Sequence, residues 1–284
     1  MATLLTLRRR IKTARNVSKT TKAMQMIAAS KLKKAQSAAV QSKPYVEKLE
    51  VLSKEMSVRL DRDNLNEYMI KPGNTNSKLY IVIAPDKGLC GGLVTNLMRE
   101  IVKMDEKSKN YFITVGKKAE NSVSAMDKEI IAAFSFGTTL PSFEAVYPLA
   151  SIIDDYFLQK KVSEVVIITT KFVNVFSQSP HISTLLPITL LEDTKRVEST
   201  MLFEPTTNEL LPDLLKRYIE MMLYQSMLES YASEQASRMI AMKNATDNAL
   251  DIIDSLKLMY NKSRQEKITN ELLDITGGMQ LAYV

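Results

Sequence analysis

The chain has 284 residues, 45% of them hydrophobic, which is enough to bury a substantial core in one large domain or two ordinary ones. Its single cysteine, Cys90, excludes an internal disulfide framework, and its single histidine, His181, excludes a multi-histidine metal site and argues against common hydrolytic chemistry. The net charge of +6 is unevenly distributed, and no apolar run approaches the roughly 20 residues that span a bilayer, so the composition indicates a soluble or peripheral protein.

A long helix is predicted from Thr3 to about Leu60, where apolar residues recur in strides of three and four. Pro44 should kink this helix, because proline lacks a backbone N–H donor and crowds the preceding turn. In the first half of the helix, three polar residues interrupt the apolar stripe, and the stripe resumes at displaced positions. The interrupting residues are Ser18, Thr21 and Gln25, and the displaced ones are Val17, Met24 and Ile27.

The same helix carries a basic face without compensating acidic residues, because Met1–Lys43 contains eleven Lys and Arg and no Asp or Glu. Such a face should meet an acidic partner: nucleic acid, an anionic membrane surface or an acidic protein loop. An acid-free N-terminus could also mimic a mitochondrial transit peptide. Binding to nucleic acid is disfavoured because no aromatic residue before Tyr45 can stack on bases. The basic residues are Arg8, Arg9, Arg10, Lys12, Arg15, Lys19, Lys22, Lys31, Lys33, Lys34 and Lys43.

The middle of the chain alternates short β-branched apolar runs with helix-length segments. This alternation predicts βαβ units, a mostly parallel sheet and helices on both of its faces. The expected strands are Lys78–Ala84, Asn110–Val115, Glu129–Phe136 and Ser163–Thr170, with a further strand around Ile182–Leu186. The expected helices are Leu93–Glu106, Lys117–Met126 and Pro141–Lys160.

The loop Asp86–Gly92, with the sequence DKGLCGG, lies between the first predicted strand and helix, where phosphate-binding loops usually lie. It matches neither the dinucleotide-binding pattern nor the P-loop pattern, since Lys87 precedes the glycines. A structural turn is favoured, and a nucleotide-binding enzyme is the alternative. Cys90 is interpreted as a small buried residue and not as a nucleophile.

A second long helix is predicted from Asn208 to Met279, with no proline after Pro212 and no glycine before Gly277. The residues of its seam follow coiled-coil spacing, and small alanine and flexible methionine side chains outnumber leucine among them, so a partner helix can approach closely. A polar belt lies above an apolar tip, which needs a socket. The seam is Leu228, Ala232, Gln235, Met239, Met242, Thr246, Ala249, Ile253, Leu256 and Tyr260; the belt is Arg264, Gln265, Thr269, Asn270 and Glu271; the tip is Met279, Leu281, Ala282, Tyr283 and Val284.

These elements predict an α/β fold: a long antiparallel coiled coil of the N- and C-terminal helices with an inserted Rossmann-like α/β domain. The expected boundaries are 1–60 for the N-terminal helix, 61–77 for a linker, 78–205 for the α/β domain and 206–284 for the C-terminal helix. Neither helix would be stable alone at this length, so each should bury the other's seam.

Four stretches resemble the gamma subunits of F-type ATP synthases, the central rotor stalk, in their bacterial form. They are RIK…N…KTTKAMQMIAASK at 10–31, DKGLCGG at 86–92, ASEQASRM…AMKNATDNA at 232–249 and YNKSRQ…IT…EL at 260–272. The resemblance implies a subunit that is not catalytic itself and couples rotation of a membrane c-ring to conformational cycling of the beta catalytic sites. The alternative function is a basic coiled-coil protein that binds nucleic acid or an anionic membrane.

The resemblance also implies partners and location. The partners are the alpha and beta subunits of a hexamer, the epsilon subunit and the c-ring of a proton-translocating complex, with no nucleic acid and no membrane span in the chain itself. The expected location is peripheral, on the cytoplasmic face of the bacterial plasma membrane, because the match begins within the first ten residues and leaves no separate transit peptide. The alternative is the matrix side of the mitochondrial inner membrane.

Carried over residue by residue, the resemblance implies polar contacts with the catch loops of beta, a basic surface for its acidic lever loop and a tip, from Gly277 onward, in an apolar bearing. The catch-loop contacts are Arg264, Gln265, Thr269 and Glu271, and the lever-loop contacts are Arg9, Lys12, Lys22 and Met24. No catalytic, cofactor-binding or metal-binding residue is expected.

The sequence departs from the family at two places near the tip. Glu266 and Lys267 place charges where the family usually has small residues. Gly277 and Gly278 should loosen the last turns by about 1 kcal/mol each relative to alanine. With Cys90 alone, the thiol switch of the plant-chloroplast form should be absent.

Overall fold

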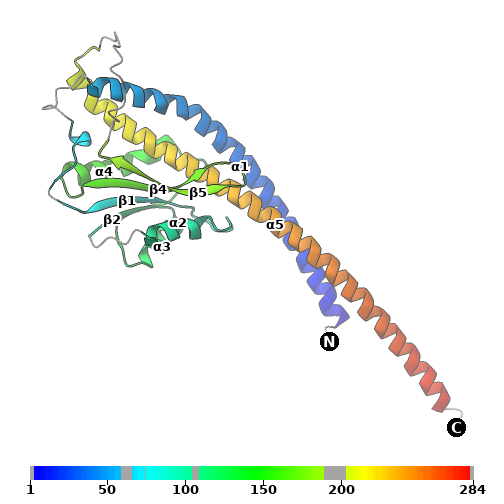
Figure 1. Cartoon of the computed structure of the whole chain (residues 1–284). Coiled ribbons are helices and arrows are strands. Elements are labelled where there is room, and N and C mark those ends of the chain that lie inside the picture. Colours follow the sequence, from blue (N-terminus) through cyan, green and yellow to red (C-terminus); the bar gives the residue numbers. More distant parts are fainter. Residues whose placement is uncertain (1–2, 59–65, 74, 104–108, 189–202, 282–284) are drawn as a thin grey trace. The chain divides into compact units, whose positions relative to one another are not determined.

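A computed structural model describes residues 3–58, 66–73, 75–103, 109–188 and 203–281, with the backbone alone at 54, 57, 58 and 274–281 (Figure 1). Contacts divide the chain into two units. The first unit comprises Met1–Ile27 and Met239–Val284, and the second comprises Ala28–Arg238. The two predicted terminal helices, α1 (Leu4–Val58) and α5 (Thr207–Leu281), contribute to both units. The predicted boundaries at residues 60, 77 and 205 remain predictions.

The second unit is built on a five-stranded sheet with the order β3-β2-β1-β4-β5. The strand β1 pairs in parallel with β2 and β4, β2 pairs in parallel with β3, and β5 runs antiparallel to β4. The prediction of a mostly parallel sheet is therefore confirmed, including the additional strand. The strands are β1 (Lys78–Ile83), β2 (Tyr111–Val115), β3 (Glu129–Phe134), β4 (Glu164–Phe172) and β5 (Gln178–Leu186).

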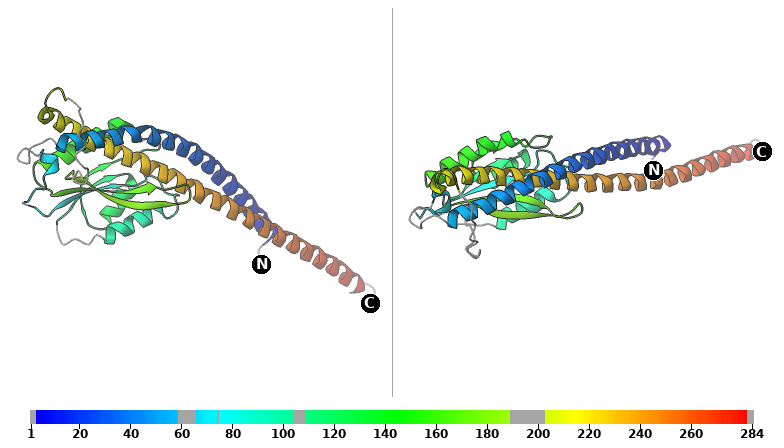
Figure 2. Two further views of the ribbon diagram at one scale, coloured as in Figure 1. Left: turned by 45° about the horizontal axis from the view of Figure 1, so that its top comes forward. Right: turned by 90° about the horizontal axis from the view of Figure 1, so that it is seen from above.

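Helices cover both faces of the sheet. The helices α2 and α3 lie against one face, and α4 and α5 lie on the other (Figures 1 and 2). The predicted helix at 141–160 is interrupted at its start, because a short 3₁₀ turn precedes α4, where Pro148 occupies the first turn that suits proline. The elements are η2 (Glu67–Met69), α2 (Leu93–Lys103), α3 (Lys117–Ser124), η3 (Phe143–Val146) and α4 (Tyr147–Leu158).

The core follows from the alternation of side chains along the strands. In β1, Tyr80 and Val82 face the buried cluster that includes Leu97 of α2 and Val123 of α3. The intervening residues point to the opposite face and are also buried, as expected for a central parallel strand. The buried residues on that side come from β1, α4 and α5. They are Leu79, Ile81 and Ile83 of β1, Ile153 and Phe157 of α4, and Leu215, Ile219 and Leu223 of α5.

The two long helices also pack on each other within the second unit. Val46 and Leu49 of α1 form a buried cluster with Met221 of α5. The Ser42 hydroxyl donates a hydrogen bond of 2.6 Å to Oε1 of Gln225. The helix α1 remains one helix through Pro44, and the kink expected there remains a prediction.

The first unit is an antiparallel pair formed by the beginning of α1 and the continuation of α5, which extends past the start of α1 (Figure 2). The predicted seam of α5 is visible here, because Met242, Thr246, Ala249 and Ile253 are buried while most of the residues between them are exposed. The remaining seam residues of this unit, Met239, Leu256 and Tyr260, are half-buried. The described part of α5 continues through Gly277 and Gly278 to Leu281. The predicted tip depends on side chains outside the described ones, and residues 282–284 lie outside the described residues altogether.

The interpretation of the α1 stripe was wrong in one respect. Ser18, Thr21 and Gln25 are half-buried and stay in the seam. The displaced apolar residues Val17, Met24 and Ile27 are instead 46%, 38% and 57% exposed. Thr21 remains inside because its hydroxyl and that of Thr246 lie 2.7 Å apart and hydrogen-bond across the helix pair.

Candidate functional site

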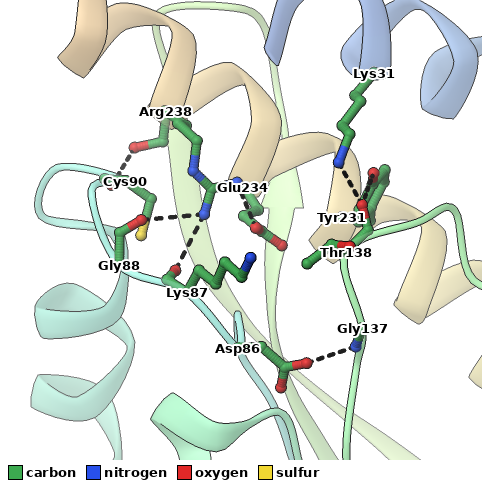
Figure 3. Close-up of polar contacts among 11 residues, drawn as sticks. Lys31, Asp86, Lys87, Gly88, Cys90, Gly137, Thr138, Tyr231, Glu234 and Arg238 are labelled. Atoms are coloured by element: carbon green, nitrogen blue, oxygen red, sulfur yellow. Dashed lines mark hydrogen bonds and ion pairs between the residues drawn. The ribbon is translucent and has the colours of Figure 1, made fainter. Parts of the chain in front are cut away.

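The loop that follows β1 is organised by the carboxylate of Asp86 (Figure 3). Oδ1 accepts hydrogen bonds from the backbone N–H of Lys117 at 2.8 Å and of Phe136 at 3.2 Å. Oδ2 accepts from the Gly137 N–H at 2.6 Å and from the Ser135 hydroxyl at 2.9 Å. A single side chain after β1 therefore holds the chain where it leaves β2 and β3, and β3 ends two residues earlier than predicted because residues 135–137 turn toward Asp86.

Hydrogen bonding determines the charge of this carboxylate. Partial burial alone would raise the pKa of Asp86, but the four hydrogen bonds outweigh it and lower the pKa below 3.8. Gly116 allows the close approach, because its φ is +101° and a Cβ there would lie 1.9 Å from the Ala84 carbonyl oxygen. The close approach at Gly116 was not predicted; its position directly after a predicted strand was the only signal in the sequence.

The other side of the loop is bound by α5 (Figure 3). Nη2 of Arg238 donates to the carbonyl oxygens of Lys87 at 3.1 Å and Gly88 at 3.2 Å. The hydroxyl of Ser237 donates to the Cys90 carbonyl at 2.5 Å. Leu89 lies between these anchored residues with a φ of +63°, which is uncommon for a residue other than glycine. The loop is thus held in a specific conformation by side chains of the same chain.

Arg238 also pairs with Glu234 one turn earlier, with 2.5 Å between Nη1 and Oε1. Burial raises the pKa of Glu234, and the neighbouring Arg238 guanidinium partly opposes this shift. In an open parallel sheet, nucleotides bind where the strand order reverses, which in this sheet is beside β1 and β4. Here the carbonyl groups of the loop bind α5, so the geometry favours the structural-turn interpretation of Asp86–Gly92.

Cys90 in this loop fits the predicted small buried residue. Cys90 is buried, and burial raises the pKa of its thiol, which disfavours the reactive thiolate. Within the described residues, no group of three or more His, Cys, Asp or Glu side chains is arranged to hold a metal ion. Among the described helices, none is both long and apolar enough to cross a bilayer.

The predicted lever-loop contacts all lie on α1 in the first unit. Arg9, Lys12 and Lys22 are exposed, and Lys22 Nζ donates to Gln25 Oε1 at 3.3 Å. Met24 is among the partly exposed apolar side chains. Arg9 and Lys12 are three residues apart and share a helix face, whereas Lys22 and Met24 are two apart and do not. The structure therefore brings together only part of this predicted set.

A shallow groove between α1 and α5 adds detail to the basic surface. Its volume is about 430 Å³, and it combines the cationic side chains of Arg9 and Arg10 with the apolar side chains of Ile252 and Leu256. Thr6, Thr13 and Ala14 complete the lining. Such a surface suits an acidic segment that also carries apolar residues. The cationic side of this groove was predicted from the sequence, whereas its apolar side on α5 was not.

The predicted catch-loop contacts occupy two turns of α5, also in the first unit. Arg264, Gln265, Thr269 and Glu271 are all exposed. The Thr269 hydroxyl donates to the Gln265 carbonyl at 3.0 Å. The carboxylate of Glu271 pairs with Lys267 Nζ at 3.4 Å, so one of the charges that departs from the family is paired with a predicted contact residue. Both side chains are mostly exposed, and such a pair is readily exchanged for another partner.

Exposed apolar side chains accompany this polar belt on α5. They fall outside the predicted seam positions, and Ile268 and Leu272 belong to the stretch that resembles gamma subunits. Their exposure follows from the geometry, since α1 covers only one side of α5 and α5 then extends past the start of α1 (Figure 2). They are Leu258, Met259, Ile268, Leu272 and Leu273.

Comparison with known proteins establishes the family. A family model described as ATP synthase matches residues 3–281. An ATP synthase gamma chain of Dehalococcoides mccartyi is 38% identical over 280 residues, which are 98% of each chain. The chain belongs to the ATP synthase gamma-chain family. A second gamma chain, from Christiangramia forsetii, is 37% identical over 284 residues and 99% of each chain.

Solved structures extend the likeness of this gamma-chain family member to the fold. The central stalk and c-ring structure of the Tetrahymena thermophila mitochondrial ATP synthase contains a chain with 25% identity and a TM-score of 0.61, over 79% of this chain and 98% of that one. A chain in the OSCP, F1 and c-ring structure of the Euglena gracilis mitochondrial enzyme shares the fold, with 20% identity, a TM-score of 0.70 and coverage of 98% and 93%. The predicted family and fold class are confirmed.

Proposed function

We propose that the chain is the rotor of the central stalk in a proton-translocating F-type ATP synthase and is not itself catalytic. The full-length match to gamma chains carries the proposal. In this role the chain couples rotation of a membrane c-ring to conformational cycling of the beta catalytic sites for ATP synthesis and hydrolysis. The α/β domain at 78–205 rests with the epsilon subunit on the c-ring, and the helix pair enters the hexamer of alpha and beta subunits.

The physical basis of the coupling is the asymmetry of the first unit. One side of α1 carries Arg9 and Lys12, while the continuation of α5 carries polar and apolar side chains that α1 does not cover. Three equivalent beta subunits around such a helix pair meet three different surfaces. A surface that binds one conformation of beta more tightly raises the population of that conformation. Because the conformations differ in nucleotide affinity, rotation changes the affinity of each catalytic site in turn.

Two contact regions follow from this role. Arg9, Lys12, Lys22 and Met24 face the acidic lever loop of beta, and the groove beside Arg9 and Arg10 accommodates its apolar residues. Arg264, Gln265, Thr269 and Glu271 bind the catch loops of beta. When beta supplies a cationic side chain, Glu271 leaves its ion pair with Lys267 and pairs with that cation. The exchange costs little, because an exposed ion pair contributes only about 0–1 kcal/mol of stability.

The location follows from the same role. The chain is peripheral, on the cytoplasmic face of a bacterial plasma membrane, and it is held there through the c-ring. The basic α1 face binds protein and not lipid in this arrangement. Vesicle flotation of the free chain at moderate salt should therefore recover little protein, since purely electrostatic binding weakens steeply with salt.

Reconstitution with purified alpha and beta subunits tests the proposal. We expect the chain to assemble in single copy with three alpha and three beta subunits, to raise their ATP hydrolysis, and to hydrolyse no ATP alone. A stable homodimer that ignores both partners, or ATP hydrolysis by the chain alone, would contradict the proposal.

The basic face is tested by replacing Arg9, Lys12 and Lys22 with alanine in the assembled complex. The triple variant should lower ATP-driven proton pumping per ATP hydrolysed more than it lowers assembly. A matched control removes three exposed charges from the second unit, at Lys48, Lys128 and Lys171. Loss of assembly with normal coupling in the remaining complexes would show that the face is only structural.

The belt is tested by Gln265→Ala and Thr269→Val, which remove neutral hydrogen-bonding groups without changing charge. Each should slow ATP hydrolysis by the complex while leaving the unfolding of the free chain unchanged, because both side chains are exposed. Asn248→Ala, at an exposed position away from the belt, is the control. Normal hydrolysis in both belt variants would remove these residues from the contact.

A further inference from the structure

We propose that Asp86 is a positioning residue for torque transfer: it fixes residues 135–138 at the carboxyl edge of the sheet, where both long helices are hydrogen-bonded, and it begins the loop 86–92, which α5 also binds. The inference rests on the proposed rotor function and adds to it the place where turning force passes between the α/β domain and the helices. All the residues concerned lie in the second unit.

The first step is that Asp86 sets the position of residues 135–138. Its carboxylate accepts hydrogen bonds from the Phe136 and Gly137 N–H groups and from the Ser135 hydroxyl, directly before Thr138. Figure 3 shows the bond to Gly137. It also binds the N–H of Lys117 at the start of α3. Charge-assisted hydrogen bonds of this kind are stronger than neutral ones, and several on one carboxylate fix the loop in one conformation.

The second step is that both helices bind the loop that Asp86 fixes. The Thr138 carbonyl accepts a hydrogen bond from Lys31 Nζ of α1 and another, of 3.3 Å, from the Tyr231 hydroxyl of α5 (Figure 3). One carbonyl oxygen thus joins α1, α5 and the edge of the sheet. Rotation of the domain about the helices must carry this oxygen with it or break both bonds.

The third step is that Asp86 itself begins the loop bound by α5. Arg238 holds the carbonyls of the next two residues, and Ser237 holds that of Cys90. The helix α5 is therefore hydrogen-bonded to two segments at this edge of the sheet. One is the loop 86–92, which begins at Asp86, and the other is the loop 135–138, which the Asp86 carboxylate holds. Because hydrogen bonds are directional, they resist sliding of the helices along the sheet more than non-directional apolar packing does.

The test compares Asp86→Asn with the unaltered chain in assembled complexes in vesicles. An amide has the shape of the carboxylate, but its NH₂ group faces N–H donors and cannot accept from them. Hydrogen exchange at the Lys117, Phe136 and Gly137 amides should quicken about tenfold, since hydrogen bonds to a charged group are lost. Proton pumping per ATP hydrolysed should fall about twofold or more. Asp127→Asn, an exposed carboxylate of the same domain, should change neither.

A second variant separates force transfer from stability of the domain. Lys31→Met keeps the aliphatic stem but removes the bond to Thr138, and Lys34→Met on the same helix is its control. Pumping per ATP should fall for Lys31→Met while exchange at Lys117 stays normal. Normal pumping in Lys31→Met, or in Asp86→Asn despite faster exchange, would overturn the inference, as would normal exchange in Asp86→Asn. If the unaltered chain failed to assemble with alpha and beta subunits, the proposed function itself would fall.

Discussion

The two units use the same two helices in different ways. In the second unit, six consecutive residues of α5, Tyr231–Ala236, are buried, so the helix is covered on all sides by the sheet, its loops and α1. In the first unit, burial on α5 returns only at every third or fourth residue, from Met242 to Ile253. The second unit therefore supplies its own core, whereas the first leaves most of its surface available to other subunits.

The largest expected difference between the units concerns the same substitution at two buried isoleucines. Ile81 in β1 is 0% exposed and Ile253 in α5 is 4% exposed. Ile81→Ala should cost about 2–5 kcal/mol, because the close-packed core cannot collapse into the cavity. Ile253→Ala should cost less, about 1–2 kcal/mol, because a two-helix seam can relax. Urea unfolding measures both, with the exposed Ile252→Ala as control. Equal costs would remove the distinction between the units.

The next prediction concerns the close backbone packing at the carboxyl edge of the sheet. Gly116→Ala should destabilise the chain by about 3 kcal/mol, because the new Cβ meets the Ala84 carbonyl and the positive φ is strained. Gly137→Ala is the matched control, since its φ is +76° but no atom lies within 4 Å of the Cβ position. It should cost only the backbone strain, about 1–2 kcal/mol. Similar melting temperatures for the two variants would contradict the close approach at Gly116.

A smaller effect depends on pH. The lowered pKa of Asp86 means that its ionised form stabilises the fold at pH values above 3.8, and that this contribution is lost as the pH falls through the lowered value. The free energy of unfolding of Asp86→Asn should therefore differ from that of the unaltered chain by a constant amount above about pH 5, and the difference should shrink below about pH 4.

Glu234 provides the control for that pH dependence, because burial raises its pKa. A raised folded-state pKa stabilises the fold at low pH, and this contribution is lost as the pH rises through it, so the effect of Glu234→Gln has the opposite slope. A constant difference for Asp86→Asn across the acidic range would show that its carboxylate is not held ionised by the loop.

The smallest effect tests the polar part of the seam in the first unit. The hydroxyls of Thr21 and Thr246 lie 2.7 Å apart across the pair, so one of them donates to the other while the accepting hydroxyl donates to a carbonyl of its own helix. A double-mutant cycle with Thr21→Val and Thr246→Val should give a coupling energy of about 0.5–1 kcal/mol. The same cycle with Thr21→Val and the exposed Ile252→Val should give none. Additive effects in the first cycle would mean that these hydroxyls do not fix the register.

The sequence predicted the fold well where hydrophobic periodicity is strong. The two long helices, the buried run of β1 and the α5 seam all follow from strides of two, three and four. It failed at Thr21, where a polar residue stays in the seam because its partner is Thr246, 225 positions away along the chain. Periodicity counts apolar residues and carries no information about such pairs.

The candidate site was predictable to a different degree in the two units. The basic face and the polar belt were identified from charge and from family resemblance, and their exposure fits a binding surface. The network around Asp86 was not identified, because three of its four donors are the backbone N–H groups of Lys117, Phe136 and Gly137, which have no signature in the sequence. Only the glycines at 116 and 137 marked the turns involved.

Amide hydrogen exchange on the free chain and on the chain assembled with alpha and beta subunits tests the central difference between the units most directly. We predict strong protection of β1, β4 and Tyr231–Ala236 in both states. Protection of 4–27 and of α5 beyond residue 239 should be weak in the free chain and strong in the complex. Equal protection of both units in the free chain, unchanged on assembly, would contradict the account.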